Sequence, residues 1–222
     1  MGGSIQLCDI APALDLHGAV FLESLVGRLA IEAERPVVEQ CLARQLNDFD
    51  TCEVPREFMR SAAAACLEVL VATGLMTDTG GQMSGTLINK RPQEGRRPWH
   101  QDWRWWNFPV SSRPRAVQVG MLIYFETTSL QNGATQAILG SHVNPDLHIS
   151  GPAAYEDAPG AVTFCAQPGD CLLFDARTCH GTHTNLTDKN RLAVVIWHLL
   201  ESAPASEEGA AFPLYGEACR RE

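Results

Sequence analysis

The feature that most constrains the fold is a change in sequence periodicity near residue 82. Before it, apolar residues recur at helical spacing over residues 15–47, and a further such stretch covers 55–72, so we expect helices over 15–74. Pro36 is expected within the first turn of the second helix, and Gly74 just beyond the third. After it, short segments rich in Val, Ile, Thr and aromatic residues alternate with Gly, Pro and Asn, which is typical of strands. We predict strands near residues 84–90, 116–125, 134–138, 161–165, 170–175, 178–184 and 191–200.

The order of these elements predicts the fold class. Helices first and many strands later favour an α+β protein with a double-stranded β-helix core (a jelly roll, cupin-like) and the N-terminal helices packed outside it. A chain of 222 residues suits one domain over 1–222, with a helical part at 15–74 and a jelly-roll part at 82–200. Residues 143–160 hold three prolines and are expected to form a loop over one end of the jelly roll.

Composition narrows the class of partner. The formal net charge of -9 argues against nucleic acid, and no apolar run approaches the roughly 20 residues that a membrane helix needs. None of the eight cysteines forms a C-x-x-C pair. With no secretory signal recognised, we expect a cytoplasmic protein that acts on a small molecule, and the sequence is compatible with a homodimer.

The first chemical motif is the run Trp99-His100-Gln101-Asp102. On a strand, residues i and i+2 point to the same face, so His100 and Asp102 would share one face. A neutral imidazole and a carboxylate so placed form two legs of a facial metal triad. The motif is common by chance, so a third ligand from elsewhere in the chain is needed.

The second chemical motif lies in residues 169–191. An apolar strand leads into a turn and then into His180, and Arg191 follows eleven residues later at the head of a second apolar strand. A guanidinium that enters a core needs an anionic partner, and its planar fork matches a carboxylate. The distal carboxylate of 2-oxoglutarate would be such a partner; a structural pair with Asp170, Asp175 or Asp188 is the alternative.

Together, these segments resemble the phytanoyl-CoA dioxygenase family over about residues 82–200. The resemblance rests on the motif that begins at Leu87-Ile88-Asn89-Lys90 and ends at His100-Gln101-Asp102, on Asn132–His142 with its Gly-Ser-His ending, and on His180-Gly181-Thr182 with Asn185, Thr187 and Arg191. One departure is Leu139, which stands where the family usually has proline.

The resemblance implies site residues and cofactors. His100, Asp102 and His180 would bind Fe(II), and Arg191 would bind the co-substrate 2-oxoglutarate, with O₂ as the oxidant. Thr182, Thr86 and Thr135 would be further co-substrate contacts. His183 would point to the opposite strand face from His180 and lacks an arginine at +11, and His142 is expected to order the Gly-Ser-His turn.

The function implied is that of a non-heme Fe(II)- and 2-oxoglutarate-dependent dioxygenase that releases succinate and CO₂. Hydroxylation of an unactivated C–H bond is the default outcome, and desaturation, ring closure and epoxidation stay open. The aromatic run Trp103–Phe108 suits a small, largely apolar substrate, such as a secondary metabolite, with Trp103 as a wall and Arg104 facing a polar group. Packing of the core is the alternative role for this run.

Two other functions remain open at this point. A cupin-like hydrolase or isomerase could hold zinc or manganese on the same triad without 2-oxoglutarate, but this leaves Arg191 unexplained. A non-catalytic small-molecule-binding protein on the same scaffold would usually have lost a metal ligand, whereas all three candidate ligands are present.

Overall fold

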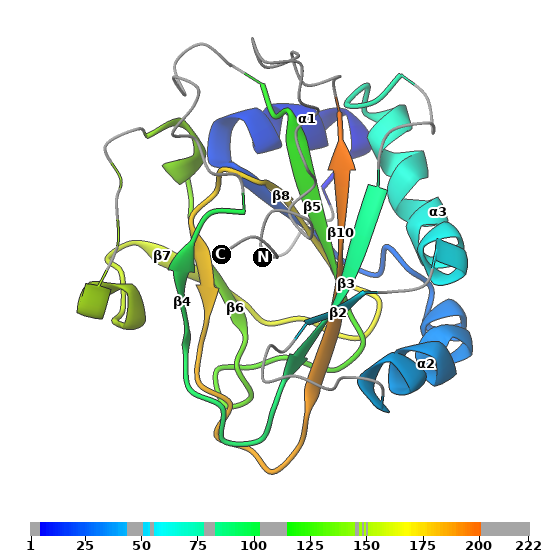
Figure 1. Cartoon of the computed structure of the whole chain (residues 1–222). Helices are drawn as coiled ribbons and strands as arrows, with labels where there is room; N and C mark the ends of the chain where they lie inside the picture. Colours follow the sequence, from blue (N-terminus) through cyan, green and yellow to red (C-terminus); the bar gives the residue numbers. More distant parts are fainter. Residues whose placement is uncertain are drawn as a thin grey trace, which may run out of the picture.

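The computed structural model describes residues 5–43, 51–53, 56–77, 83–102, 115–144, 147, 149 and 151–200. Its helices and strands follow the order helix, strand, helix, strand, helix and then strands (Figure 1). The elements are α1 (Leu7–His17), β1 (Ala19–Leu22), α2 (Arg28–Ala43), β2 (Thr51–Glu53), α3 (Arg56–Ala72), β3 (Met83–Lys90), β4 (Arg97–His100), β5 (Gln118–Tyr124), β6 (Thr135–Ile138), η2 (Ser141–Val143), η3 (Gly151–Tyr155), β7 (Ala161–Phe164), β8 (Cys171–Asp175), β9 (His180–Thr182) and β10 (Arg191–Leu199).

The strands form two sheets that face one another. The major sheet has the order β1-β8-β5-β10-β3-β2 and the minor sheet the order β4-β9-β6-β7. Every pairing between named strands is antiparallel. In Figure 1 the minor sheet lies to the left, while α2 and α3 lie beyond the major sheet to the right. This mixed architecture with antiparallel sheets agrees with the predicted α+β class.

Strand alternation divides the major sheet into two faces. On β5, Val119, Met121 and Ile123 belong to the core cluster that also contains Leu14 of α1 and Leu70 of α3. The intervening residues point between the two sheets, where Leu122 and Tyr124 pack with Ala193, Val195 and Trp197 of β10. Strand β10 is hydrogen-bonded on both sides, to β3 and β5, and its residues 191–198 are all buried. It is therefore a firmly held support for side chains that enter the interior.

The prediction of two helices over residues 15–47, with Pro36 in the first turn of the second, is wrong in part. Helix α1 ends at His17 because Gly18 adopts φ 77°, a left-handed conformation that favours glycine, and its N–H bonds to the Leu14 carbonyl. The next residues, Ala19–Leu22, form β1 and pair with β8. Pro36 lies inside α2 and does not open it. Helix α3 closely matches the expected span of 55–72, and Gly74 beyond it has φ 71°.

The predicted strands after residue 82 are all present, as β3 and β5 to β10. Strand β4 was not predicted, because its sequence Arg-Pro-Trp-His lacks the β-branched alternation of the others. The described part of the expected loop 143–160 contains the end of η2 and all of η3, and η3 packs against β4. Within the described segments, no helix combines the length and hydrophobicity that crossing a bilayer requires.

Candidate metal and co-substrate site

The three residues expected to bind a metal converge at the junction of β4 and β9. His100 ends β4 and faces His180 at the start of β9, since the two are register partners. Their imidazole centroids lie 4.3 Å apart. Asp102 lies two residues beyond β4, and its Oδ1 is 3.6 Å from Nε2 of both histidines. One ligand atom from each residue fits within 4.8 Å of the others, which suits coordination of one metal ion.

Both imidazoles are oriented by their own backbone. Nδ1 of His100 donates to the Pro98 carbonyl at 2.8 Å, and Nδ1 of His180 donates to the Thr178 carbonyl at 2.9 Å. In a neutral ring so bonded, the lone pair is on Nε2, the nitrogen that faces Asp102. Burial, followed by the neighbouring His180, lowers the pKa of His100 to about 4. The ring is therefore neutral near pH 7, the state that a metal ligand requires.

The turn that precedes His180 is held from several directions. The Cys179 N–H donates to Oγ of Ser141 at 2.8 Å, and the Thr178 hydroxyl donates to the Gly18 carbonyl at 2.7 Å. His142 donates through Nε2 to the Asp15 carbonyl at 3.0 Å. The Gly-Ser-His segment therefore orders this region, as the sequence suggested for His142, and supports the position of His180.

One aromatic contact also packs against His180. The ring of Phe174 lies 4.8 Å from the His180 ring, centroid to centroid. A Cβ atom on its register partner Gly120 would come within 2.3 Å of the Phe174 ring. The absence of a side chain at Gly120 thus allows Phe174 to occupy the place in which it contacts His180.

Arg191 is a buried cation without a carboxylate partner among the described residues. Its side chain is 1% exposed, and only Nη2 is hydrogen-bonded, to the Gly133 carbonyl at 3.1 Å, while Nε and Nη1 have no partner. Burial lowers its pKa to about 10, which leaves the guanidinium charged near pH 7. Desolvating an unpaired guanidinium is costly, so the arrangement fits an anion that arrives from outside.

Asp170 and Asp175, two of the carboxylates considered as structural partners of Arg191, are bonded to other groups. Asp175 is engaged by Arg177, through Nε at 2.9 Å and through Nη2. The Asp170 carboxylate accepts the backbone N–H groups of Ser24 and Gln167, at 2.8 and 2.7 Å. Neither carboxylate pairs with Arg191.

Two further buried polar atoms beside Arg191 have no hydrogen-bond partner other than each other. They are the hydroxyl oxygens of Tyr124 on β5 and Thr135 on β6, which face one another across the interior. Burial raises the pKa of Tyr124, so its phenol is a neutral donor. Orphaned buried polar atoms are rare in native proteins. A carboxylate between Arg191, Tyr124 and Thr135 would satisfy them, and the residues therefore fit 2-oxoglutarate.

The family of the protein follows from comparison with known sequences. The family model for phytanoyl-CoA dioxygenase (PhyH) matches residues 23–193. The chain belongs to the phytanoyl-CoA dioxygenase family. It is accordingly an iron- and 2-oxoglutarate-dependent oxygenase, and the metal donor set and the buried cation described above suit both cofactors.

Named relatives support the same assignment. The chain is 26% identical to the iron/alpha-ketoglutarate-dependent dioxygenase penM of Penicillium thymicola, over 88% of this chain and 69% of that protein. It is also 36% identical, over 75 residues, to the dioxygenase peniF of Penicillium patulum, which covers 34% of this chain and 22% of that protein.

Solved structures share the fold. The carbocyclase SnoK from nogalamycin biosynthesis superposes with a TM-score of 0.71 at 15% identity, covering 100% of this chain and 94% of its own. The epimerase SnoN in complex with Fe3+, alpha ketoglutarate and nogalamycin RO gives 0.69 at 16% identity, with 93% and 95% covered. EvdO2 from Micromonospora carbonacea var. aurantiaca, complexed with 2-oxoglutarate, gives 0.67 at 21% identity, with 89% and 92% covered. The core is thus the jelly roll of 2-oxoglutarate-dependent enzymes.

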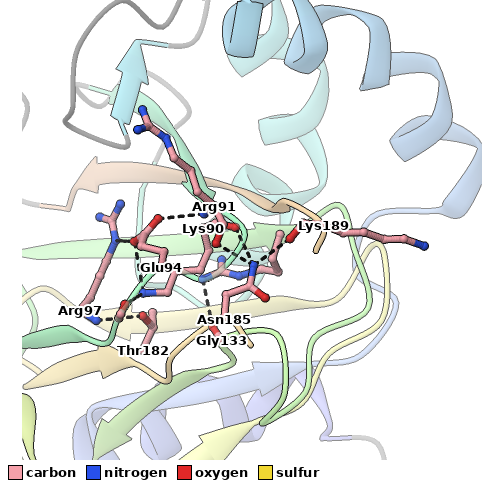
Figure 2. Close-up of polar contacts among 10 residues, drawn as sticks. Lys90, Arg91, Glu94, Arg97, Gly133, Thr182, Asn185 and Lys189 are labelled. Carbon is pink, nitrogen blue, oxygen red and sulfur yellow. Dashed lines mark hydrogen bonds and ion pairs between the residues drawn. The ribbon is translucent and has the colours of Figure 1, made fainter. Parts of the chain in front are cut away.

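A second buried cation of this oxygenase, Lys90, lies beside Arg191. The sequence analysis assigned it no role. Lys90, the register partner of Arg191, is 0% exposed. Its Nζ lies 3.2 Å from Oε1 of Glu94, which Figure 2 shows beside it. Nζ also donates to the Gly95 carbonyl. Burial lowers the pKa of Lys90. Its place at the end of a strand run that reads Leu-Ile-Asn-Lys could have revealed it, because a lysine that continues a buried strand needs a partner.

The Asn185 side chain stabilises the strand ends that carry these cations. Its amide group donates to the carbonyls of Lys90, Arg91 and Lys189 at 3.0, 2.9 and 2.8 Å (Figure 2). Its Oδ1 accepts from the Thr187 hydroxyl at 2.7 Å. Asn185 and Thr187 of the family motif therefore fix the loop between His180 and Arg191.

The remaining candidate residues separate into three groups. Thr182 and Thr135 are register partners on the face of the minor sheet that carries His180, and the Thr182 hydroxyl accepts the Arg97 N–H at 3.4 Å. Thr86 lies on β3 opposite Val195, on the inner face. Trp103 and Arg104 lie outside the described residues.

His183 does not belong to the metal-ligand group. Its Nε2 lies 3.1 Å from the Thr163 hydroxyl, and its Nδ1 lies 3.4 Å from Nη2 of Arg96. These contacts are on the opposite face of the minor sheet from His180, as strand alternation predicted.

Proposed function

We propose that the chain is a dioxygenase that hydroxylates an unactivated C–H bond of a small, largely apolar molecule. Fe(II) would be held by Nε2 of His100, Oδ1 of Asp102 and Nε2 of His180. The distal carboxylate of 2-oxoglutarate would be bound by Arg191. Thr182, Thr135 and Thr86 would be further co-substrate contacts. The observation that carries the proposal is the buried Arg191 guanidinium, whose Nε and Nη1 have no hydrogen-bond partner.

The ligand set determines what chemistry is available. When bound, Fe(II) with 2-oxoglutarate and O₂ supplies an oxidant that removes hydrogen from a C–H bond, with succinate and CO₂ as products. Two imidazoles and one carboxylate would supply three ligand atoms to the ion, and its remaining positions would be available to co-substrate and O₂. Leu122, Leu172 and Val195, which line the inner face of the major sheet, exclude water from the space between the sheets.

Two features oppose the other functions. A metal hydrolase or isomerase would have no use for Arg191, whose burial without a counter-charge is unfavourable. A non-catalytic binding protein would not need a complete donor set with both histidine tautomers fixed. An outcome other than hydroxylation remains compatible with the same site, since SnoK is named a carbocyclase and SnoN an epimerase.

One titration tests the proposal. Anaerobic addition of Fe(II) to the metal-free protein, with and without 2-oxoglutarate, is expected to give the weak visible charge-transfer band of an Fe(II)–2-oxoglutarate chelate only when both are present. Binding of Fe(II) with no spectral response to 2-oxoglutarate would favour the metal-hydrolase alternative. Analysis of the products formed from O₂ labelled with ¹⁸O would then separate hydroxylation from ring closure, desaturation and epimerisation.

Tyr124→Phe is expected to weaken 2-oxoglutarate binding while leaving metal affinity unchanged, because it removes only a donor that faces the proposed carboxylate site. A net hydrogen bond of about 0.5–1.5 kcal/mol predicts a KM for 2-oxoglutarate about 2–12-fold higher. Tyr155→Phe is the matched control, since Tyr155 is 59% exposed on η3. An unchanged KM in the Tyr124 variant would show that the phenol does not contact the co-substrate.

We propose that Gln118 contacts a polar group of the substrate. It lies on the inner face of β5, two residues from Gly120, whose partners Trp197 and Phe174 contact Asp102 and His180. Arg191 and Tyr124 lie in the opposite direction along the sheet, so Gln118 is on the side of the metal ligands away from the co-substrate. It is 3% exposed, and Nε2 has no hydrogen-bond partner. Trp103 and Arg104 are proposed to border the same substrate.

Gln118→Leu is expected to raise the KM for the substrate about 2–12-fold, from the loss of one net hydrogen bond, without changing the KM for 2-oxoglutarate. Gln136→Leu is the control, because Gln136 is similarly buried but bonds to Thr163 on the outer face of the minor sheet. Arg104→Ala measured beside them tests whether the polar group is anionic. If neither Gln118→Leu nor Arg104→Ala changes substrate KM, the polar contact is made elsewhere.

A further inference from the structure

The two oxygens of the Asp102 carboxylate have different surroundings. Oδ1 lies 3.6 Å from Nε2 of both His100 and His180. Oδ2 accepts a hydrogen bond from the indole Nε1 of Trp197 at 2.8 Å. The carboxylate is almost completely buried, with its side chain 3% exposed. One oxygen therefore faces the candidate metal position, and the other is already occupied by a protein donor.

Trp197 is the rigid member of this pair. Its strand, β10, is paired on both sides, with Ser84 and Gly120 as its register partners, and the residue is 3% exposed. Asp102 lies beyond the end of β4, a strand whose pairing with β9 is irregular between Arg97 and His100. The hydrogen bond joins residues 95 positions apart in sequence and connects the two sheets. The tryptophan is thus the member of the pair that a paired strand holds in place, whereas Asp102 lies outside any strand.

We propose that Trp197 is a positioning residue that restricts Asp102 to coordination of the metal through one oxygen. The inference rests on the proposed ligand set. A carboxylate can bind a metal through one oxygen or through both, and the second mode would take a coordination position that 2-oxoglutarate or O₂ requires. With Oδ2 held by the indole N–H, Asp102 would occupy only one position and leave the others for 2-oxoglutarate and O₂.

Strand β10 carries both Arg191, proposed to bind the co-substrate, and Trp197, proposed to orient the metal ligand Asp102. Arg191 and Trp197 are on the inner face of β10, at its two ends. Arg191 is directed to the co-substrate carboxylate, and Trp197 to the metal-binding carboxylate. Strand β10 lies between β5 and β3. This single rigid strand therefore defines the distance between Arg191 and the tryptophan that contacts Asp102.

The test removes the indole N–H and keeps the ring. Replacement of Trp197 by β-(3-benzothienyl)alanine exchanges the N–H for sulfur at nearly constant shape, and Trp197→Phe is the genetically simpler variant. Trp99→Phe is the matched control, because Trp99 is 4% exposed and its Nε1 donates at 2.8 Å to the Glu156 carbonyl and not to a proposed ligand. For each protein, Mn(II) affinity is measured by anaerobic titration, and the charge-transfer band is recorded at saturating Fe(II) and 2-oxoglutarate.

Loss of the N–H is expected to raise the Kd for Mn(II) about 10–100-fold, as for other groups that orient metal ligands. The charge-transfer band is expected to weaken or shift even at saturating iron, because the carboxylate no longer presents one oxygen to the metal in a fixed direction. A benzothienyl variant with wild-type affinity and spectrum would overturn the proposal, and so would equal changes in Trp99→Phe. If Trp197→Phe does not fold, the isosteric variant decides.

These outcomes are separable from failure of the proposed function. A wild-type protein that binds Mn(II) but gives no band with Fe(II) and 2-oxoglutarate refutes the co-substrate assignment, and the Mn(II) affinities of the variants still decide the role of Trp197. A wild-type protein that binds neither metal removes both proposals.

Discussion

His100→Ala is expected to abolish both metal binding and turnover. The imidazole is one of the three proposed metal ligands among the described residues, and its Nε2 lies 3.6 Å from Oδ1 of Asp102. Removing it leaves one histidine and one carboxylate, too few to hold Fe(II) at cellular concentrations against water. The measurement is metal content after anaerobic loading and desalting, together with succinate formed from 2-oxoglutarate.

A matched histidine variant controls for loss of an imidazole in general. His183 belongs to the same motif, but its ring contacts Thr163 and Arg96 on the other face of the minor sheet. His183→Ala is therefore expected to retain iron and turnover, while His180→Ala behaves like His100→Ala. Full iron occupancy in the His100 variant would mean that another residue is the ligand.

Sequence reasoning located the strands that are long and apolar. Strands β5 and β10 lie in continuous buried stretches, and their composition alone indicated them. Strand β1 was missed because Ala19–Leu22 continues the apolar spacing of the preceding helix, and its pairing with β8 lies about 150 residues away in the chain. Local sequence does not contain that partner, so the extended conformation of these residues is decided by tertiary pairing.

The same distinction applies to the site. His100, Asp102, His180 and Arg191 could be selected because spacing and family resemblance both point to them, and the structure brings the three proposed metal ligands together. Tyr124 and Trp197 were missed because each is one aromatic residue in an apolar strand. Their importance depends on register: Tyr124 pairs with Ala193, and Trp197 reaches Asp102 from the opposite sheet. Sequence periodicity gives the face of a strand, but it does not give what lies across the interior.

The second large effect is expected at Arg191, where the oxygenase and the metal-hydrolase alternatives differ. Its guanidinium is fully buried, with Nε and Nη1 unpaired and one bond to the Gly133 carbonyl. Losing one partner of a desolvated charged pair typically costs about 3–5 kcal/mol. At about 1.4 kcal/mol per tenfold change, this is a factor of several hundred or more in affinity. Arg191→Ala should therefore raise the KM for 2-oxoglutarate by two to three orders of magnitude, and the affinity for Fe(II) alone should stay nearly unchanged.

Two further variants make the Arg191 result specific. Arg191→Lys should fall between alanine and wild type, because it keeps the charge but loses the planar fork. Arg35→Ala should leave the KM for 2-oxoglutarate unaltered, since Arg35 bonds to Glu126 and the Phe125 carbonyl near the surface. Thermal unfolding with and without 2-oxoglutarate separates binding from folding: Arg191→Ala should fold but lose the stabilisation that the co-substrate gives to wild type. Normal turnover of Arg191→Ala at low 2-oxoglutarate would place the co-substrate elsewhere. An unfolded Arg191→Ala and a folded Arg191→Lys with normal 2-oxoglutarate affinity would assign the guanidinium to the core.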